Sequence, residues 1–142
     1  MSLKKIFLVL WSVFSFETAA VIHAAPVEIA RNGRAMMPVI HGARATAETK
    51  ALAGKLSDML KKMSGADFAV KEGDGSEGIA LGTLEDFPTL ATKVVFQPND
   101  LLKREEYALK SHQKGVWALG ATTLACQHAM WDMLHRLGYR QY

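Results

Sequence analysis

The fold is decided by residues 46–70, whose sequence is TAETKALAGKLSDMLKKMSGADFAV. Apolar side chains recur there at the period of an α-helix, namely Leu52, Leu56, Met59, Leu60 and Met63. Thr46 suits the N-cap, and Gly65 suits the left-handed residue after the last turn. Gly54 costs roughly 1 kcal/mol relative to alanine, so we expect it to mark a close approach to a neighbouring element. The stretch predicts one long helix leading into a short strand near residues 67–73.

A two-residue turn precedes this helix, in the sequence VEIARNGRAMMPVIH of residues 27–41. Asn32 and Gly33 both tolerate the positive φ angles of a type I′ turn, which joins adjacent antiparallel strands. We therefore expect one strand before the turn and a second strand near residues 36–40. Because Pro38 lacks a backbone N–H, this second strand is expected at an edge of the sheet.

Three further strands are predicted after the glycine-rich sequence EGDGSEG. The apolar IALG of residues 79–82 predicts a strand buried on both faces. Residues 83–100 predict a short helix followed by irregular chain. Tyr107 and Leu109 alternate with Ala108 and Lys110 before the turn HQKG, and the apolar residues 116–119 follow it, which predicts a hairpin.

The last long apolar pattern, ATTLACQHAMWDMLHRLG, covers residues 121–138 and predicts the second main helix. Thr122 or Thr123 caps its first turn, and Gly138 ends it. The order of elements predicts an α/β (α+β) fold built as a two-layer sandwich. We expect a mixed sheet of about five strands with the two main helices on one face.

The first 25 residues have the layout of a secretory signal peptide. Lys4 and Lys5 precede the apolar run IFLVLWSVFSF, and small residues follow it. This run is about half the ~20 residues that a membrane-spanning helix needs. Cleavage after Ala20 or after Ala25 fits the pattern, and we take residues 26–142 as the mature domain. The predicted location is the periplasm or the extracellular space, with no membrane attachment after cleavage.

The mature domain is close to electrical neutrality. The leader holds Lys4, Lys5 and Glu17, so residues 26–142 carry 15 of the 17 basic and 13 of the 14 acidic side chains. A balance this even gives no electrostatic support for binding nucleic acid. Cys126 is the only cysteine, so the chain forms no disulfide within itself and relies on its apolar core.

No catalytic, metal or cofactor site is predicted from the residues. His128 and His135 lie about 10 Å apart along the predicted helix, which is too far to share one ion. Cys126 stands among apolar residues, which favours a buried thiol over a nucleophile. The adjacent carboxylates at residues 85–86 and 105–106 point to opposite sides of an extended chain. We expect solvated charges there rather than the facing carboxyl pair of a glycosidase.

Four aromatic residues in the C-terminal part of the chain are candidates for recognition, namely Trp117, Trp131, Tyr139 and Tyr142. Such rings stack on sugars, and they serve equally well in a core or a protein interface. The residues alone leave these alternatives open.

The sequence motifs of residues 27–142 follow one another in a definite order. A helix ending in LKKMSGADFAV precedes the short GIALG, and EEYALKSHQKGVWALGA leads into AMWDMLHRLGYRQY. This order resembles the N-terminal α/β accessory domain of glycoside hydrolases, as in domain 2 of β-N-acetylhexosaminidases and the N-terminal domain of α-glucuronidases. Glu106 and Tyr107 match the start of the family's hairpin, and Gly120 matches the glycine that ends it. The matches in the final helix are Ala129, Trp131, Leu134, Leu137, Gly138 and Arg140.

Two positions depart from the family pattern. Ala125 stands where a second glycine is common, and Gln141 stands where an aromatic residue often follows the arginine. In the relatives the catalytic carboxylates lie in a TIM barrel that follows this domain, so no catalytic residue is carried over to residues 26–142.

The resemblance implies an exported, non-catalytic accessory domain of carbohydrate-processing proteins, either standalone or truncated before its barrel. The implied partners are a glycoside hydrolase catalytic barrel or a glycan. The candidate contacts are Trp131, Tyr139, Arg140 and Tyr142. Two alternatives remain open, namely a protein-interaction module that docks through its final helix, and a small hydrolase in its own right.

Overall fold

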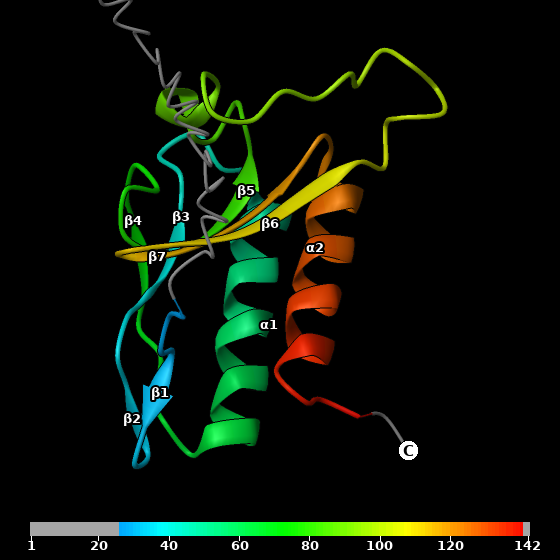
Figure 1. Ribbon diagram of the computed structural model, residues 1–142. Coiled ribbons are helices and arrows are strands. Elements are labelled where there is room, and N and C mark those ends of the chain that lie inside the picture. The colour runs from blue at the N-terminus through cyan, green and yellow to red at the C-terminus, as the bar shows by residue number, and fades with distance from the viewer. Residues whose placement is uncertain (1–25, 141–142) are drawn as a thin grey trace, which may run out of the picture.

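A five-stranded mixed sheet carries two helices on one face in the computed structural model, which describes residues 26–140 (Figure 1). This arrangement confirms the predicted two-layer α/β sandwich. The predicted signal peptide and Tyr142 lie outside the described residues. Within residues 26–140, no helix has the length and apolarity needed to cross a bilayer. The elements in chain order are β1 Ala30–Arg31, β2 Arg34–Ala35, β3 Val39–His41, α1 Ala47–Ser64, β4 Val70–Glu72, β5 Gly78–Thr83, the 3-10 helix η1 Pro88–Leu90, β6 Tyr107–His112, β7 Gly115–Gly120 and α2 Thr123–Arg136.

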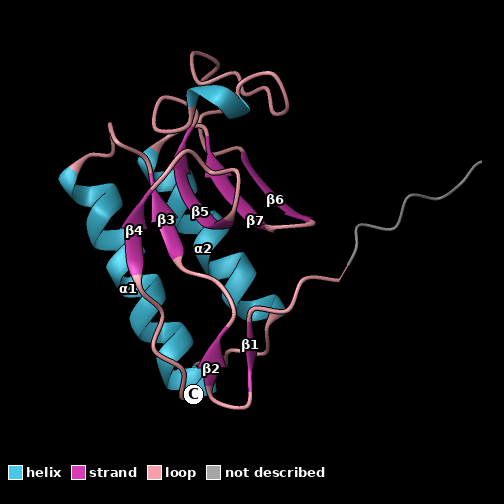
Figure 2. Ribbon diagram, turned by 90° about the vertical axis from the view of Figure 1, so that its left-hand side faces the viewer, coloured by secondary structure: helices cyan, strands magenta, loops and turns pink. Residues whose placement is uncertain are grey.

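The strand order of the main sheet is β4-β3-β5-β7-β6. Four of these strands run parallel, and β6 pairs antiparallel with β7 through the predicted hairpin. α1 follows β3 and α2 follows β7, so both helices begin at the edge where the parallel strands end. Figures 1 and 2 show both helices on the same face of the sheet. The carboxyl ends of the four parallel strands and the amino ends of two helices therefore lie at one end of the molecule.

Helix α1 forms as its sequence predicts. The Thr46 side chain accepts a hydrogen bond from the Thr49 N–H (3.2 Å), and Gly65 has a φ of +75° directly after the last turn. Leu56 and Leu60 are buried in the core between helices and sheet. The expectation for Gly54 is wrong, because a Cβ added there would meet no atom within 4 Å.

The turn before α1 is also confirmed, with φ angles of +50° at Asn32 and +71° at Gly33 between β1 and β2. The strand expected near residues 36–40 is wrong in its bounds, because β2 ends at Ala35 and a separate strand, β3, begins at Val39. β3 also lies between β4 and β5 rather than at an edge. Pro38 is tolerated because it stands just before β3, where only its carbonyl is used, accepting from the Ile79 N–H (2.9 Å).

The Thr122 side chain accepts from the Ala125 N–H (3.2 Å), so Thr122 rather than Thr123 is the N-cap of helix α2. Cys126 lies wholly inside the core, as predicted for a structural thiol. Burial raises the pKa of this thiol to about 12, so the sulfur stays protonated at neutral pH.

The face of the sheet without helices is covered by the chain between β5 and β6. This connection holds the predicted short helix, η1, and packs on the sheet through Leu84, Phe87, Leu90, Val94 and Phe96. This packing explains why every residue of β5 except Thr83 is buried, as predicted for a strand covered on both faces. The buried side chains of this second core are Ile40, Ala80, Phe87, Leu90, Trp117 and Leu119.

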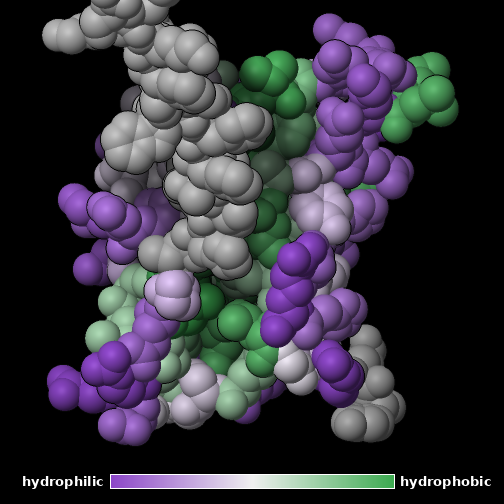
Figure 3. Space-filling view, viewed as in Figure 1, coloured by the Kyte–Doolittle hydropathy of each residue, from purple (hydrophilic) through white to green (hydrophobic). Residues whose placement is uncertain are grey.

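The rest of this connection extends away from the sheet (Figure 1). Leu101 and Leu102 are 78% and 94% exposed there. Figure 3 shows hydrophobic side chains at the end of this loop among hydrophilic neighbours. The neighbours include Lys103 and Arg104.

His112, at the end of β6, makes the stability of the second core depend on pH. Its ring stacks on Trp117 with centroids 4.8 Å apart, and its Nε2 is buried without a partner in the described part of the chain. Burial, followed by the charges of Lys93 and Lys110, lowers the pKa of His112 below its ordinary value. At pH values between the folded and the unfolded pKa, His112 is protonated in the unfolded chain and neutral in the folded protein.

We therefore expect the free energy of unfolding to fall as the pH drops below about 6.5, the ordinary histidine pKa. Urea unfolding at about pH 7.5 and about pH 5.5, on either side of that value, measures the loss. His112→Phe keeps the stacking and should show a smaller loss than the original protein. His128→Gln removes a more exposed histidine and serves as control. An equal loss in the original and the His112→Phe proteins would contradict the assignment.

Candidate functional site

An aromatic cluster lies at the C-terminal end of α2. Trp131 and His135 lie one turn apart on α2, and Tyr139 follows the end of the helix. The ring centroids of Trp131 and Tyr139 are 5.8 Å apart, and those of His135 and Tyr139 are 6.3 Å apart. Lys55 of α1 adds a cation, with its Nζ 5.0 Å from the centroid of the Trp131 ring. We call these four residues the aromatic surface.

The turn after α2 places Tyr139 in this cluster. Gly138 has a φ of +103°, a conformation that favours glycine, and it reverses the chain at the end of the helix. The Tyr139 N–H then donates to the Leu134 carbonyl (2.9 Å). The Tyr139 ring is thereby held beside α2 instead of continuing away from it.

Trp131 and Tyr139 are partly buried and pack against the core, while His135 is exposed. Tryptophan and tyrosine suit such half-exposed positions because one end of the ring is apolar and the other end bonds to polar groups. Two of the four predicted contact residues are thus brought together. Arg140 follows them, but its Nη1 donates to the carbonyls of Tyr139 (2.9 Å) and His135 (3.3 Å) at the end of α2. The fourth, Tyr142, lies outside the described residues.

A polar link joins α2 to the edge strand near this surface. Asp132 pairs with Arg136 one turn further along (2.9 Å) and accepts from the Tyr107 hydroxyl on β6 (3.1 Å). The Arg136 hydrogen bond, more than any other contact, lowers the pKa of Asp132. Desolvation, and then the Asp132 carboxylate, raises the pKa of Tyr107. The tyrosine that matches the family's hairpin motif therefore ties β6 to the helical layer.

Trp117, the other aromatic candidate, belongs to the second core instead. It is 6% exposed, and its indole N–H donates to the Gly75 carbonyl (2.9 Å). Lys93 and Lys110 place their ammonium groups 5.2 and 5.8 Å from the centre of its ring. The indole is therefore part of the packing of the sheet and presents no open face for stacking.

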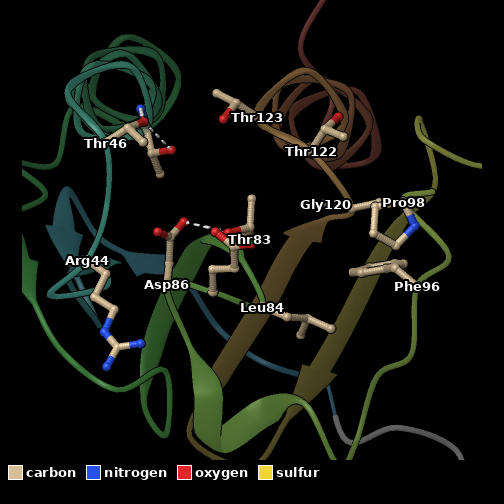
Figure 4. Close-up of a pocket in the computed structure, with 13 residues that line it drawn as sticks. Arg44, Thr46, Thr83, Leu84, Asp86, Phe96, Pro98, Gly120, Thr122 and Thr123 are labelled. Atoms are coloured by element: carbon tan, nitrogen blue, oxygen red, sulfur yellow. Dashed lines mark hydrogen bonds between the residues drawn. The ribbon is translucent and has the colours of Figure 1, made fainter.

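A second candidate site, which the sequence reasoning missed, lies where the parallel strands end. It is a cavity of about 450 Å³ between the first turns of both helices and the ends of β5 and β7 (Figure 4). We call it the strand-end cavity. Open α/β sheets commonly bind ligands at this edge, outside the carboxyl ends of the strands. Its lining residues are Arg44, Thr46, Thr49, Thr83, Leu84, Glu85, Asp86, Phe96, Pro98, Gly120, Ala121, Thr122 and Thr123.

Asp86 is the buried acid of this cavity, with 7% of its surface exposed. Its Oδ2 accepts from the Thr83 N–H (2.8 Å) and the Thr83 hydroxyl (3.2 Å). The expectation that residues 85–86 are solvated loop charges is therefore wrong for Asp86, although Glu85 is exposed. The physical reason is that the Asp86 carboxylate satisfies the backbone N–H left unpaired where β5 ends.

Glycines at the strand ends allow the elements around Asp86 to pack closely. A Cβ on Gly42 would lie 2.1 Å from the Asp86 carbonyl oxygen, and one on Gly82 would lie 2.6 Å from the Asp86 Oδ2. A Cβ on Gly120 would lie 2.3 Å from the Cys126 nitrogen. The signal that would have found this site is a repeated pattern, since all three of these strand ends have a glycine followed within four residues by a threonine.

Within residues 26–140, no three of the His, Cys, Asp and Glu side chains are arranged to hold a metal ion. The His128 Nδ1 lies 3.9 Å from the Glu105 Oε2, and the two side chains are 41% and 59% exposed. A pair this exposed interacts weakly, because water screens it.

No protein-family model matches the chain, and no curated protein sequence matches it significantly. The likeness to glycoside hydrolase accessory domains therefore remains a prediction from the sequence motifs. Function is argued below from the two sites themselves.

Proposed function

We propose that residues 26–142 are an exported, non-catalytic accessory domain of carbohydrate-processing, glycoside hydrolase-like proteins. In this proposal the aromatic surface contacts a glycan or the catalytic domain that the accessory domain serves. The observation that carries the proposal is the half-exposed pair of Trp131 and Tyr139, held together beside Lys55. The order of sequence motifs supplies the carbohydrate context.

The chemistry of the aromatic surface suits a sugar. A sugar ring has an apolar face of C–H groups and a rim of hydroxyls. The half-exposed indole of Trp131 offers apolar surface, and the Tyr139 hydroxyl and the Lys55 ammonium over the indole offer polar groups. This combination binds the face and the rim of a ring at the same time.

The alternative of a hydrolase in its own right has weaker support. A general acid or base is usually tuned by burial beside a specific charged partner. His128 and Glu105 are both exposed, and Cys126 is buried with a raised pKa. Glycosidases also need two carboxyl groups facing one bond, about 5–5.5 Å or about 6.5–9.5 Å apart. The buried carboxylate of Asp86 is instead engaged by Thr83.

The proposal predicts that replacing Trp131 by alanine weakens glycan binding by about tenfold, since covering the exposed half of this large ring contributes about 1.5 kcal/mol. Binding of the purified protein to a panel of soluble polysaccharides, followed by calorimetric titration of the best one, measures this. Tyr139→Ala should weaken the same binding. Tyr107→Phe alters another half-exposed aromatic residue and should leave the affinity unchanged. Glycan binding that is equally strong in the Trp131→Ala protein would contradict the role of this surface.

Docking on a protein is a second candidate, favoured by an apolar groove between the first halves of the two helices. The groove is lined by Leu52 and Lys55 of α1 and by Leu124 and Gln127 of α2, and Leu124 is 50% exposed. Lys55 joins the groove to the aromatic surface. Under this candidate, Leu124→Asp abolishes association with a catalytic barrel of the β-N-acetylhexosaminidase or α-glucuronidase type, measured by calorimetry. Loss of glycan binding in the same variant would instead favour one continuous glycan surface.

A further inference from the structure

We propose that the strand-end cavity is a second recognition site that holds a single sugar ring, with Asp86 as acceptor and the first turn of α2 as donor. This site lies at the opposite end of α2 from the aromatic surface. The choice of a sugar among hydroxyl-rich ligands rests on the proposed carbohydrate function. The geometry of the cavity carries the remaining argument.

The acceptor is the free oxygen of the Asp86 carboxylate. Both donors from Thr83 go to Oδ2, and no hydrogen bond joins Oδ1 to another residue of the described chain. An ionised carboxylate has about four acceptor positions, and a buried one is costly unless donors fill them. Figure 4 shows the Asp86 carboxylate below the gap between the two helix ends, with one oxygen bonded to Thr83 and the other on the opposite side. A ligand in the cavity that donates hydrogen bonds would occupy the remaining acceptor positions of the Asp86 carboxylate.

The donors are at the helix ends. Thr122 caps the N–H of Ala125, which leaves the N–H groups of Thr123 and Leu124 without acceptors inside α2. Thr46 caps α1 in the same way from the opposite side of the cavity. The hydroxyl of Thr123 adds a group that both donates and accepts. Figure 4 shows Thr122 and Thr123 above Asp86 and Thr83, with the cavity between them.

The mixture of charges selects an uncharged ligand. The carboxylate of Asp86, with Glu85 nearby, repels an anion. The positive ends of two helix dipoles repel a cation. A hydroxyl group is neutral and can donate to Asp86 while it accepts from a helix N–H. A ligand with several adjacent hydroxyls therefore fits both sides of the cavity.

The remaining wall is apolar and suits the C–H face of a ring. Leu84, Phe96 and Pro98 line it, and Figure 4 shows Phe96 and Pro98 together on the side away from Asp86. The volume of about 450 Å³ lies within the ordinary range of small-molecule sites, about 300–1,000 Å³. Polar groups on one side and an apolar wall on the other are the two features that a sugar ring requires.

The test is a titration of the ¹⁵N-labelled protein with glucose, N-acetylglucosamine, inorganic phosphate and calcium chloride, followed by amide chemical shifts. We expect a sugar to shift the amides of Gly82, Thr83, Thr122 and Thr123, and we expect phosphate and calcium to shift none of them. Asp86→Asn should weaken sugar binding by at least about tenfold, because a hydrogen bond to a charged group is lost. Thr123→Val, on the half-exposed first turn, should weaken it severalfold and serves if Asp86→Asn does not fold. Asp58→Asn, on the exposed side of α1, is the matched control and should bind normally.

Three results would overturn this inference. One is the absence of shifts with either sugar at millimolar concentration. Another is preferential binding of phosphate, which would make the cavity an anion site. The third is a set of shifts confined to Trp131 and Tyr139, which would leave the proposed function standing while removing the second site. The proposed function is tested separately, through the loss of polysaccharide binding in the Trp131→Ala protein.

Discussion

Replacing Phe87 by alanine is expected to lower the free energy of unfolding by about 3–5 kcal/mol. The Phe87 side chain is wholly buried and is one of the largest buried side chains of the described chain. Its ring fits tightly, since Cβ atoms added to Gly75 and Gly82 would lie 3.1 and 2.9 Å from its edge. The cost combines the lost burial with an unfilled cavity on the helix-free face of the sheet. Urea unfolding followed by circular dichroism measures it.

Val95→Ala is the matched control for Phe87→Ala. Val95 belongs to the same connection between β5 and β6 but is 80% exposed, so its truncation should change stability by no more than about 0.5 kcal/mol. A loss below about 1 kcal/mol in the Phe87→Ala protein, less than is usual for a buried phenylalanine, would mean that this connection does not pack on the sheet.

Replacing Gly120 by alanine is expected to destabilise the protein by about 3 kcal/mol, at the upper end of the usual cost of overpacking. The new Cβ would lie 2.3 Å from the Cys126 nitrogen and 2.6 Å from the Ala125 carbonyl carbon. Both are backbone atoms of α2, so no side chain can rotate away to make room. The first turn of the helix must move from the end of β7. Thermal and urea unfolding of the variant measure the loss.

Gly54→Ala is expected to stabilise the protein, in contrast to Gly120→Ala. A Cβ at Gly54 meets nothing within 4 Å, and the residue lies in the interior of α1. Alanine there should raise the free energy of unfolding by about 0.5–1 kcal/mol, because glycine loses more backbone entropy in a helix. Equal effects at Gly54 and Gly120 would contradict the close approach of α2 to β7.

The helices were predictable because their signals are local. The apolar stripe of α1, the cap at Thr46 and the left-handed Gly65 all lie within one continuous stretch. The turn at Asn32 and Gly33 is local in the same way. The edge position predicted from Pro38 was wrong because a proline is tolerated where only its carbonyl is hydrogen-bonded. The donor to that carbonyl lies on β5, which is distant in sequence.

The burial of Asp86 and Phe87 could not be predicted by the same means. Both depend on the packing of the connection between β5 and β6 against the sheet. No periodic pattern in the sequence predicts that packing. From the sequence alone, two adjacent acidic residues in a loop are expected to be exposed to solvent. The contact of Asp86 with the backbone N–H of Thr83 becomes visible only when the strand end is in place.

The two candidate sites also differ in how much of each could be predicted from local sequence signals. Trp131 and Tyr139 were named from the sequence as candidate contacts, but Lys55 comes from the other helix and was not expected there. The strand-end cavity requires the order β3-β5-β7, which brings three strand ends together. Strand order is a non-local property, so only the repeated glycine and threonine pattern hinted at this site.

The central claim is that this domain recognises carbohydrate without cleaving it. The most direct measurement is incubation of the purified protein with a panel of aryl glycosides, followed by release of the chromogenic aryl group. The account predicts no release above the rate of a sample without protein. Cleavage of any substrate in the panel, abolished by replacing one carboxylate such as Glu105, Glu106 or Asp86 with its amide, would contradict it.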